Sequence, residues 1–267
     1  MTAPTAPTGA PEHSRLRWMV SDTLAITGRN LLTYVRLPQL VIFSTIQPIM
    51  FVLIFRYVFG GAIATPAGSY VDYLMPGIFV QTVAFGAIGT GVGLAEDLRK
   101  GLIERFRSLP MASSAVLGGR TTADLIRNVF VVSLMAAVGF LVGFRVHTSP
   151  GSFLLGIALL LLFGYAISWG FALVGLSAAN AETAQATAFP LLFPLVFASS
   201  AFVPLETMPG WLQAFAGNQP VTVTVDAVRA LMLGGPVGRP VLEALAWSLG
   251  LLALFAPLAV RRYRRTQ

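Results

Sequence analysis

Residues 153–178 read FLLGIALLLLFGYAISWGFALVGLSA, and this stretch contains no charged side chain. As an α-helix it is long enough to cross the hydrocarbon core of a bilayer, which needs about 20 apolar residues. The whole chain shares this character, since 55% of its residues are hydrophobic and 11% are charged. Globular domains normally contain about 25% charged residues. The sequence therefore predicts an all-α integral membrane protein.

Other apolar runs of similar length flank this stretch, so we predict six transmembrane helices. The predicted spans are 38–59, 74–95, 122–144, 153–178, 184–203 and 241–260. Several of these runs contain proline, which membrane helices tolerate where neighbouring groups satisfy the freed backbone carbonyl.

The positions of Arg and Lys predict how the spans are oriented, because basic residues collect on the cytoplasmic side of a membrane. With six spans, both chain ends and the 96–121 connection share one side. Fourteen of the 18 basic residues, Arg127 included, lie on or next to that side, and four lie on the other. We therefore expect cytoplasmic N- and C-termini. The net charge of +7 is then a topology signal, which argues against a nucleic-acid partner.

Besides the 96–121 connection, three segments outside the predicted spans have a recognisable character. Residues 1–13 are rich in Pro, Thr and Ala and are expected to form a disordered tail. From Leu16 to Val35, apolar residues recur at steps of three and four, which predicts an amphipathic helix in the membrane interface. Residues 204–240 are too polar to span and predict an outer, re-entrant-like helical hairpin between spans 5 and 6. We interpret this hairpin as a structural cap.

The sequence offers no catalytic or metal-binding motif. It contains no cysteine, and its histidines, His13 and His147, form no HExxH pair. A phosphate-binding P-loop needs Gly-Lys-Ser/Thr, whereas the single lysine, Lys100, is followed by glycine. We therefore expect a chain that is not an enzyme and that binds no nucleotide, cofactor or metal itself.

Uncharged polar residues within the spans are the candidates for a substrate pathway. Gln47, Gln81 and Asn128 are the ones that we single out, and Gln185 lies near the start of the fifth span. Each of these side chains also fits a hydrogen bond between helices, which is the commoner role of such residues. Gln47 is of particular interest because Pro48 follows it.

Residues 96–120, EDLRKGLIERFRSLPMASSAVLGGR, form a charged segment between two apolar runs. Apolar residues from Leu98 to Leu109 fall on one helical face. Glu96 and Lys100 can form an i,i+4 ion pair, and Pro110 ends the helix. The segment predicts a short cytoplasmic amphipathic helix whose apolar face must be covered by the membrane surface or by another protein.

Two motifs in this chain resemble those of ABC-2 type permeases, the six-span membrane subunits of ABC exporters. The first is E-x-x-x-x-G-x-x-E-R-x-x-x-x-P starting at Glu96, followed by LGGR at 117–120. The second is FP…P…SSAFVPLETMPGW…NQPV at 189–221, which looks like the fifth span and outer hairpin of the daunorubicin-resistance-type branch. The resemblance covers residues 14–267 as a single transmembrane domain. It differs from the usual pattern at Leu102, often threonine, and at Arg120, often lysine.

The resemblance implies a coupling helix that docks on a separate cytosolic ATPase. The implied coupling residues are Glu96, Gly101, Leu102, Ile103, Glu104, Arg105, Phe106, Arg107 and Pro110. It further implies that the partner uses ATP and Mg, and that a second permease subunit, identical or different, completes the transporter. A multi-pass location in the plasma (inner) membrane, in contact with membrane lipid, follows from the same resemblance.

The function that we expect is that of the permease subunit of an ATP-driven exporter of a hydrophobic drug, antibiotic or lipid-like compound. Export of a lipid or glycan precursor is an alternative. A secondary transporter driven by an ion gradient is less favoured, because carboxylates are scarce within the predicted spans. A membrane scaffold without transport activity is the remaining alternative.

Overall fold

The computed structural model describes residues 12–36, 38–60, 69–102 and 113–265, and every regular element within these ranges is helical. The long elements are α1 (Glu12–Arg36), α2 (Pro38–Ile54), α3 (Tyr70–Arg99), α5 (Ser113–Val142), α6 (Pro150–Ser177), α7 (Ala181–Phe197) and α10 (Gly238–Arg265). The shorter ones are the π-helical turn η1 (Phe55–Phe59), the 3-10 turn η2 (Leu205–Thr207), α8 (Gly210–Asn218) and α9 (Pro220–Leu233).

Four of these helices are long and apolar enough to cross a membrane: α3, α5 from Ala115, α6 and α10. They correspond to the second, third, fourth and sixth predicted spans, which confirms an all-helical membrane protein. The first predicted span coincides with α2 and η1, of which Thr45–Phe59 forms a shorter apolar stretch. The fifth corresponds to α7, which has 17 residues.

Several boundaries differ from those predicted. Helix α3 continues to Arg99, so the predicted connection starts as part of the span. Helix α7 ends at Phe197 instead of residue 203, where the Ser199 hydroxyl donates back to the carbonyl oxygen of Val196 and the Ser200 hydroxyl donates to Asp226 of α9. Within the predicted hairpin, helix α9 begins at Pro220, where the Gln219 side chain caps it by accepting from the backbone N–H of Val221. Helix α1 begins at Glu12, inside the segment assigned to the tail.

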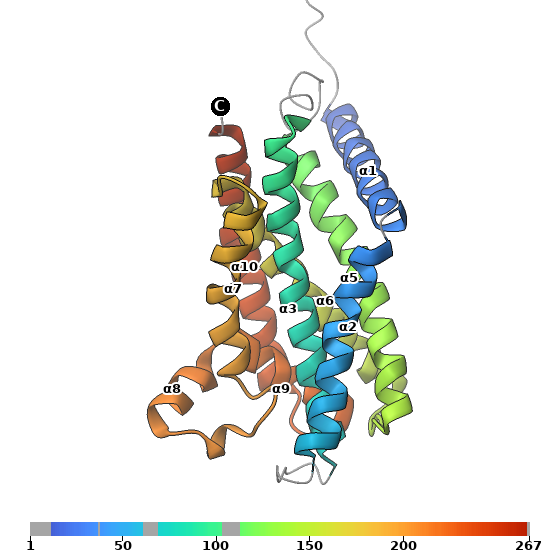
Figure 1. Ribbon diagram of the computed structural model, residues 1–267, viewed down its shortest axis with the longest axis vertical. Coiled ribbons are helices and arrows are strands. Elements are labelled where there is room, and N and C mark those ends of the chain that lie inside the picture. The colour runs from blue at the N-terminus through green and yellow to red at the C-terminus, as the bar shows by residue number, and fades with distance from the viewer. Residues whose placement is uncertain (1–11, 37, 61–68, 103–112, 266–267) are drawn as a thin grey trace, which may run out of the picture.

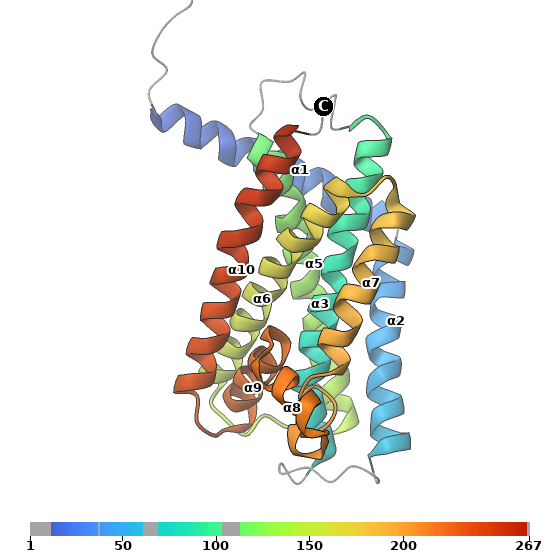
Figure 2. The same cartoon turned by 90° about the vertical axis from the view of Figure 1, so that its left-hand side faces the viewer.

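Apart from α1, the long helices run side by side along the length of the molecule (Figures 1 and 2). Helix α1, the end of α3, the start of α5 and the end of α10 gather at one end of the bundle. Helices α8 and α9 lie at the opposite end, and α1 projects sideways from the bundle in Figure 2. The predicted outer segment 204–240 therefore contains two helices, far from the end that carries the last turn of α10.

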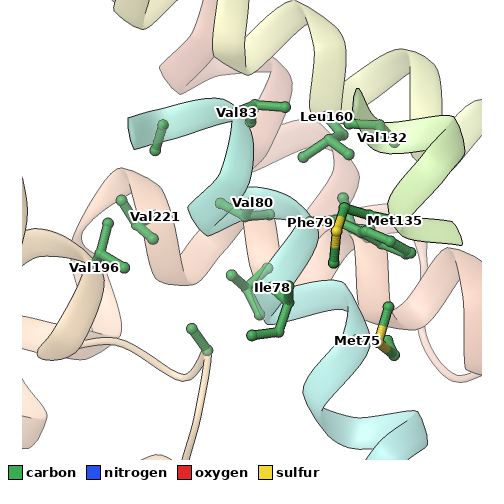
Figure 3. Packing of buried hydrophobic residues seen from close by; sticks show 14 of the residues in the cluster. Met75, Ile78, Phe79, Val80, Val83, Val132, Met135, Leu160, Val196 and Val221 are labelled. Carbon is green, nitrogen blue, oxygen red and sulfur yellow. The ribbon is translucent and has the colours of Figure 1, made fainter. Parts of the chain in front are cut away.

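Helix α3 is the centre of the bundle and contacts α6, α7, α5 and α9. Every side chain from Tyr70 to Ala84 is buried. Figure 3 shows Met75 and Phe79 of α3 packed beside Met135 of α5 and Leu160 of α6. Because lipid is as apolar as these side chains, close packing holds the helices together more than any hydrophobic driving force does.

Glycine permits the closest contacts of α3. A Cβ atom on Gly175 of α6 would lie 2.1 Å from the carbonyl oxygen of Gly91, so α3 and α6 touch backbone to backbone. A Cβ atom on Gly77 would lie 2.1 Å from the carbonyl oxygen of Ala201. Gly89 and Gly93, whose spacing suggests helix packing, instead face the guanidinium groups of two arginines on α5.

Gly175→Ala should destabilise the protein, because the added methyl group meets backbone that cannot rotate away. Over-packing of this kind costs roughly 1–3 kcal/mol. Fluorescence-detected size exclusion after heating in detergent should give a lower melting temperature than for the wild type. Gly250→Ala on α10 is the matched control, since nothing lies within 4 Å of its added methyl group. Equal melting temperatures for the two variants would contradict the contact.

Candidate functional site

A cavity of about 310 Å³ lies between α2, α3, α5 and α7. Its volume is at the lower end of the range for small-molecule sites. The three residues singled out from the sequence, Gln47, Gln81 and Asn128, all line it. Gln185 lines it as well, so four polar positions from four different helices meet in one place. The remaining lining residues are Pro48, Thr82, Phe85, Gly86, Ile88, Gly89, Val92, Arg127, Val131 and Phe189.

Helical periodicity explains how these side chains come together. On α3 the lining residues Gln81, Phe85, Ile88 and Val92 recur at steps of four, three and four and so share one face. On α2, Pro48 cannot donate a backbone hydrogen bond, which weakens the helix beside the cavity. The side chains of Gln47, Gln185 and Phe189 are exposed. The cavity is therefore open on the side where α2 and α7 lie.

Arg127 was counted from the sequence among the residues on or next to the cytoplasmic side, and in the structure its side chain lines the cavity. Its guanidinium points into the cavity wall and donates to the carbonyl oxygen of Gly86 at 2.7 Å and to Asn128 Oδ1 at 3.2 Å. The guanidinium carbon lies 5.6 Å from the ring centre of Tyr34 on α1. The sequence already indicated an inward position, because Arg127 and Asn128 lie about six residues inside the predicted span 122–144.

Several buried polar atoms at the cavity lack a hydrogen-bond partner among the described residues. They are Gln81 Oε1, Arg127 Nε and Asn128 Nδ2. Gln81 is 2% exposed and Asn128 is 3% exposed. Burying such groups without a partner is costly. This site is therefore built to hold water or the polar group of a ligand.

A second polar cluster, which the sequence analysis missed, fixes α1 to the bundle. Its centre is Asp124, which is fully buried and accepts hydrogen bonds from Tyr34 and Thr90. Arg120 Nε lies 3.6 Å from Asp124 Oδ2, and its Nη2 donates to the carbonyl oxygen of Gly89. Burial, with the Asp124 charge as a further cause, raises the pKa of Tyr34 to about 12. The phenol therefore remains a donor at neutral pH.

The same region explains the LGGR segment at 117–120. Leu117 is fully buried. A Cβ atom on Gly119 would lie 2.6 Å from Ile26, so α1 approaches α5 closely at this glycine. Thr27 donates to the carbonyl oxygen of Gly119 at 3.2 Å, and Arg120 is the partner of Asp124. The segment is therefore where α1 packs against α5.

Only the beginning of the predicted coupling helix lies within the described residues. Glu96 pairs with Lys100 at 2.9 Å, as the i,i+4 spacing predicts. Gly101 has a φ of 66°, a left-handed conformation suited to glycine at the end of α3. Leu102 is half-buried. The coupling residues Ile103, Glu104, Arg105, Phe106, Arg107 and Pro110 lie outside the described residues.

At the opposite end, polar groups fix the turn that follows α7. Arg229 of α9 donates to the carbonyl oxygen of Ser200 at 2.7 Å and pairs with Asp226 at 2.8 Å. Its guanidinium carbon lies 3.8 Å from the ring centre of Tyr73. Ser200 Oγ donates to Asp226 at 2.7 Å. These contacts give the SSAFVP part of the second motif a structural role.

The protein-family comparison matches residues 21–233 to the ABC-2 type transporter model. The chain belongs to the ABC-2 type transporter family. As a permease it is a non-catalytic, multi-pass membrane component of an ABC transporter, which confirms the family and the non-enzymatic role predicted from the sequence. A permease of this kind associates with an ATPase subunit.

Named relatives place the permease more narrowly. It is 38% identical to the daunorubicin resistance ABC transporter permease protein DrrB1 of Streptomyces coeruleorubidus, over 92% of this chain and 87% of the relative. It is 30% identical to the probable doxorubicin resistance ABC transporter permease protein DrrC of Mycobacterium tuberculosis, over 98% and 95%. A putative transport permease, ycf38 of Pyropia yezoensis, is 27% identical over 80% and 74%.

Asp124→Ala should destabilise the permease strongly, because it leaves the buried Arg120 guanidinium without its carboxylate. Breaking a buried ion pair in this way costs roughly 3–5 kcal/mol. The free energy of unfolding, measured by SDS titration in mixed micelles, should fall by that order. Glu243→Ala, which breaks an exposed pair with Arg239, is the control and should change little. A small effect at both positions would contradict the central role of Asp124.

Proposed function

We propose that this permease exports a hydrophobic drug or antibiotic, using ATP and Mg that a separate cytosolic subunit binds. The cavity carries this proposal, because Gln47, Gln81 and Asn128 are set among apolar residues between four helices. That combination of apolar walls and a few polar groups is typical of small-molecule sites. Relatives named for daunorubicin and doxorubicin resistance support the choice of a drug.

We propose six spans, with α2 and α7 as the first and fifth. Prolines within both helices and the short length of α7 are compatible with spanning where neighbours cover the backbone. The end of the bundle that carries Arg99, Lys100 and the arginines of Arg261–Arg265 is the cytoplasmic end in this proposal. Helix α1 then lies in the cytoplasmic interface, with Val20, Leu24 and Val35 exposed toward lipid.

The segment after α3 is the proposed connection to the ATPase. The predicted coupling residues begin within α3 at Glu96 and follow its end at Gly101 and Leu102. The proposed docking helix therefore starts from the same element that forms one wall of the cavity. We infer that Leu102, Ile103 and Phe106 are the apolar docking residues, and that Glu104, Arg105 and Arg107 form their polar rim. Pro110 ends the docking helix before α5 begins.

Phe106→Asp should abolish co-purification of the permease with its ATPase, because it places a charge among the apolar docking residues. The measurement is pull-down from detergent-solubilised membranes, with the membrane-inserted amount of permease determined alongside. Trp211→Asp is the control, since Trp211 is an exposed aromatic residue of α8 at the opposite end. Co-purification that survives Phe106→Asp would remove the docking assignment.

Aromatic side chains provide a surface for a hydrophobic compound between the cavity and the outer end. Successive ring centres lie 4.2–5.7 Å apart along this series. In order from the cavity they are Phe85, Phe189, Phe193, Phe197, Phe202, Phe55 and Phe59. Stacked and edge contacts with such rings favour aromatic and apolar ligands.

We propose that a second permease subunit covers the open side of the cavity. Large apolar side chains on α2 and α7, such as Ile46, Met50 and Phe193, are exposed beside it. In a paired transporter these faces meet across the transport pathway, whether the subunits are identical or different. Gln47 and Gln185 would then face the partner.

Gln81→Leu should lower ATP-dependent drug export, because it removes the buried amide from the cavity while keeping a similar volume. We expect a decrease of about tenfold, as for the loss of one well-placed hydrogen bond. Efflux of doxorubicin from cells that express the permease with its ATPase measures this. The control is Gln213→Leu on α8, an exposed glutamine outside the cavity. Unchanged efflux in Gln81→Leu would contradict the pathway, and wild-type cells that export no more doxorubicin than cells without the permease would favour a lipid or glycan precursor, or a scaffold.

A further inference from the structure

Arg127 brings a positive charge into the cavity without a carboxylate to neutralise it. Among the ion pairs of the described residues, none involves Arg127. The nearest acidic residue on the same helix is Asp124, whose two oxygens already accept from Tyr34 and Thr90 and face Arg120. A charged side chain at membrane depth is expensive and normally has a partner or a function.

The contacts that Arg127 does make hold it in place without satisfying it. Its Nη2 donates to the carbonyl oxygen of Gly86 and to Asn128 Oδ1, and its guanidinium faces the ring of Tyr34. The glycines opposite make room for the group, since a Cβ atom on Gly86 or Gly89 would lie 3.0–3.1 Å from its guanidinium nitrogens. A purely structural clamp between α3 and α5 explains these contacts but leaves Nε unbonded.

The free hydrogen-bonding groups at this place are mostly donors. Arg127 Nε and Asn128 Nδ2 are both buried without an acceptor among the described residues. The contact from Arg127 to Asn128 Oδ1 fixes the orientation of the amide, whose Nδ2 lies on the side of Gly164 of α6. The third group, the amide of Gln81, can turn to donate as well as accept. One charged group and two amides therefore belong to residues that line the same cavity.

We propose that this donor set binds an anionic oxygen group, such as a carboxylate or phosphate, on the transported compound. This inference rests on the proposed export function and names the chemical class of the ligand. The cavity volume of about 310 Å³ suits a polar headgroup, while the phenylalanine series beside it accommodates an apolar body. Charge-assisted hydrogen bonds from a guanidinium are strong and directional. A cationic group meets repulsion at the same place, so a drug with a protonated amine, such as doxorubicin, would bind with that amine directed away from Arg127.

The test compares two fluorescent dodecyl amphiphiles with the same chain and fluorophore, one ending in a carboxylate and the other in a trimethylammonium group. Their binding to the permease in zwitterionic-lipid nanodiscs is measured by fluorescence anisotropy, with empty nanodiscs subtracted. The wild type should bind the carboxylate at least about tenfold more tightly, as expected for a charge-assisted contact. Inorganic phosphate should compete with the carboxylate probe.

Variants of Arg127 assign this preference to one side chain. Arg127→Gln should remove the preference, Arg127→Glu should reverse it, and Arg127→Lys should retain it in weaker form. Arg56→Gln is the control, because Arg56 is exposed on η1 and does not line the cavity. Arg127→Lys preserves the charge and so separates loss of recognition from loss of folding, which size exclusion checks for every variant.

Each outcome decides between the inference and the function on which it rests. Equal binding of the two probes to the wild type, or an unchanged preference in Arg127→Gln, overturns the anion site and leaves water as its occupant. If doxorubicin efflux with the ATPase persists in that case, the proposed export function stands. Conversely, a charge preference that depends on Arg127 without any ATP-dependent efflux supports the site and refutes drug export.

Discussion

Every charge and backbone polar group buried at membrane depth needs a partner, and this requirement organises the permease around Asp124. Its carboxylate joins α1, α3 and α5 through Tyr34, Thr90 and Arg120. Because apolar side chains gain little by leaving lipid, such polar contacts fix which helices are neighbours. The turn after α7 follows the same rule, since Arg229 and Gln219 satisfy its carbonyl groups.

At the cavity, several buried polar groups lack a hydrogen-bond partner among the described residues. Around Asp124 a carboxylate balances the charge of Arg120, whereas one turn further along α5 the guanidinium of Arg127 has no ion-pair partner among the described residues. The difference between the two places is a difference of accessibility. Asp124 is fully enclosed, while the cavity opens beside exposed residues of α2 and α7. The structural polar cluster and the candidate ligand site therefore differ in how open they are and in whether a carboxylate balances the arginine.

Much of this could be predicted from the sequence, and the rest depends on contacts between helices. Apolar runs located the long helices to within a few residues, and polar residues within those runs located the cavity lining. Helix ends were less predictable, because they depend on single residues. Pro194 lies near the end of α7, and the Gln219 side chain caps the start of α9. The inward position of Arg127 was not predicted, since counting charges along the chain does not reveal which arginine turns toward a cavity. The arrangement around Asp124 joins residues 90 positions apart and has no local signal.

The uninterrupted course of α3 has a mechanical consequence. This helix has 30 residues and is therefore about 45 Å long. One end is tied to the turn after α7 through the hydroxyls of Tyr70 and Tyr73, its middle forms the cavity wall, and its other end leads into Gly101. Its only proline, Pro76, lies near the Tyr70 end. From Gly77 to Arg99 the helix is continuous, so a displacement of its Arg99 end would be passed along the same element to the cavity wall.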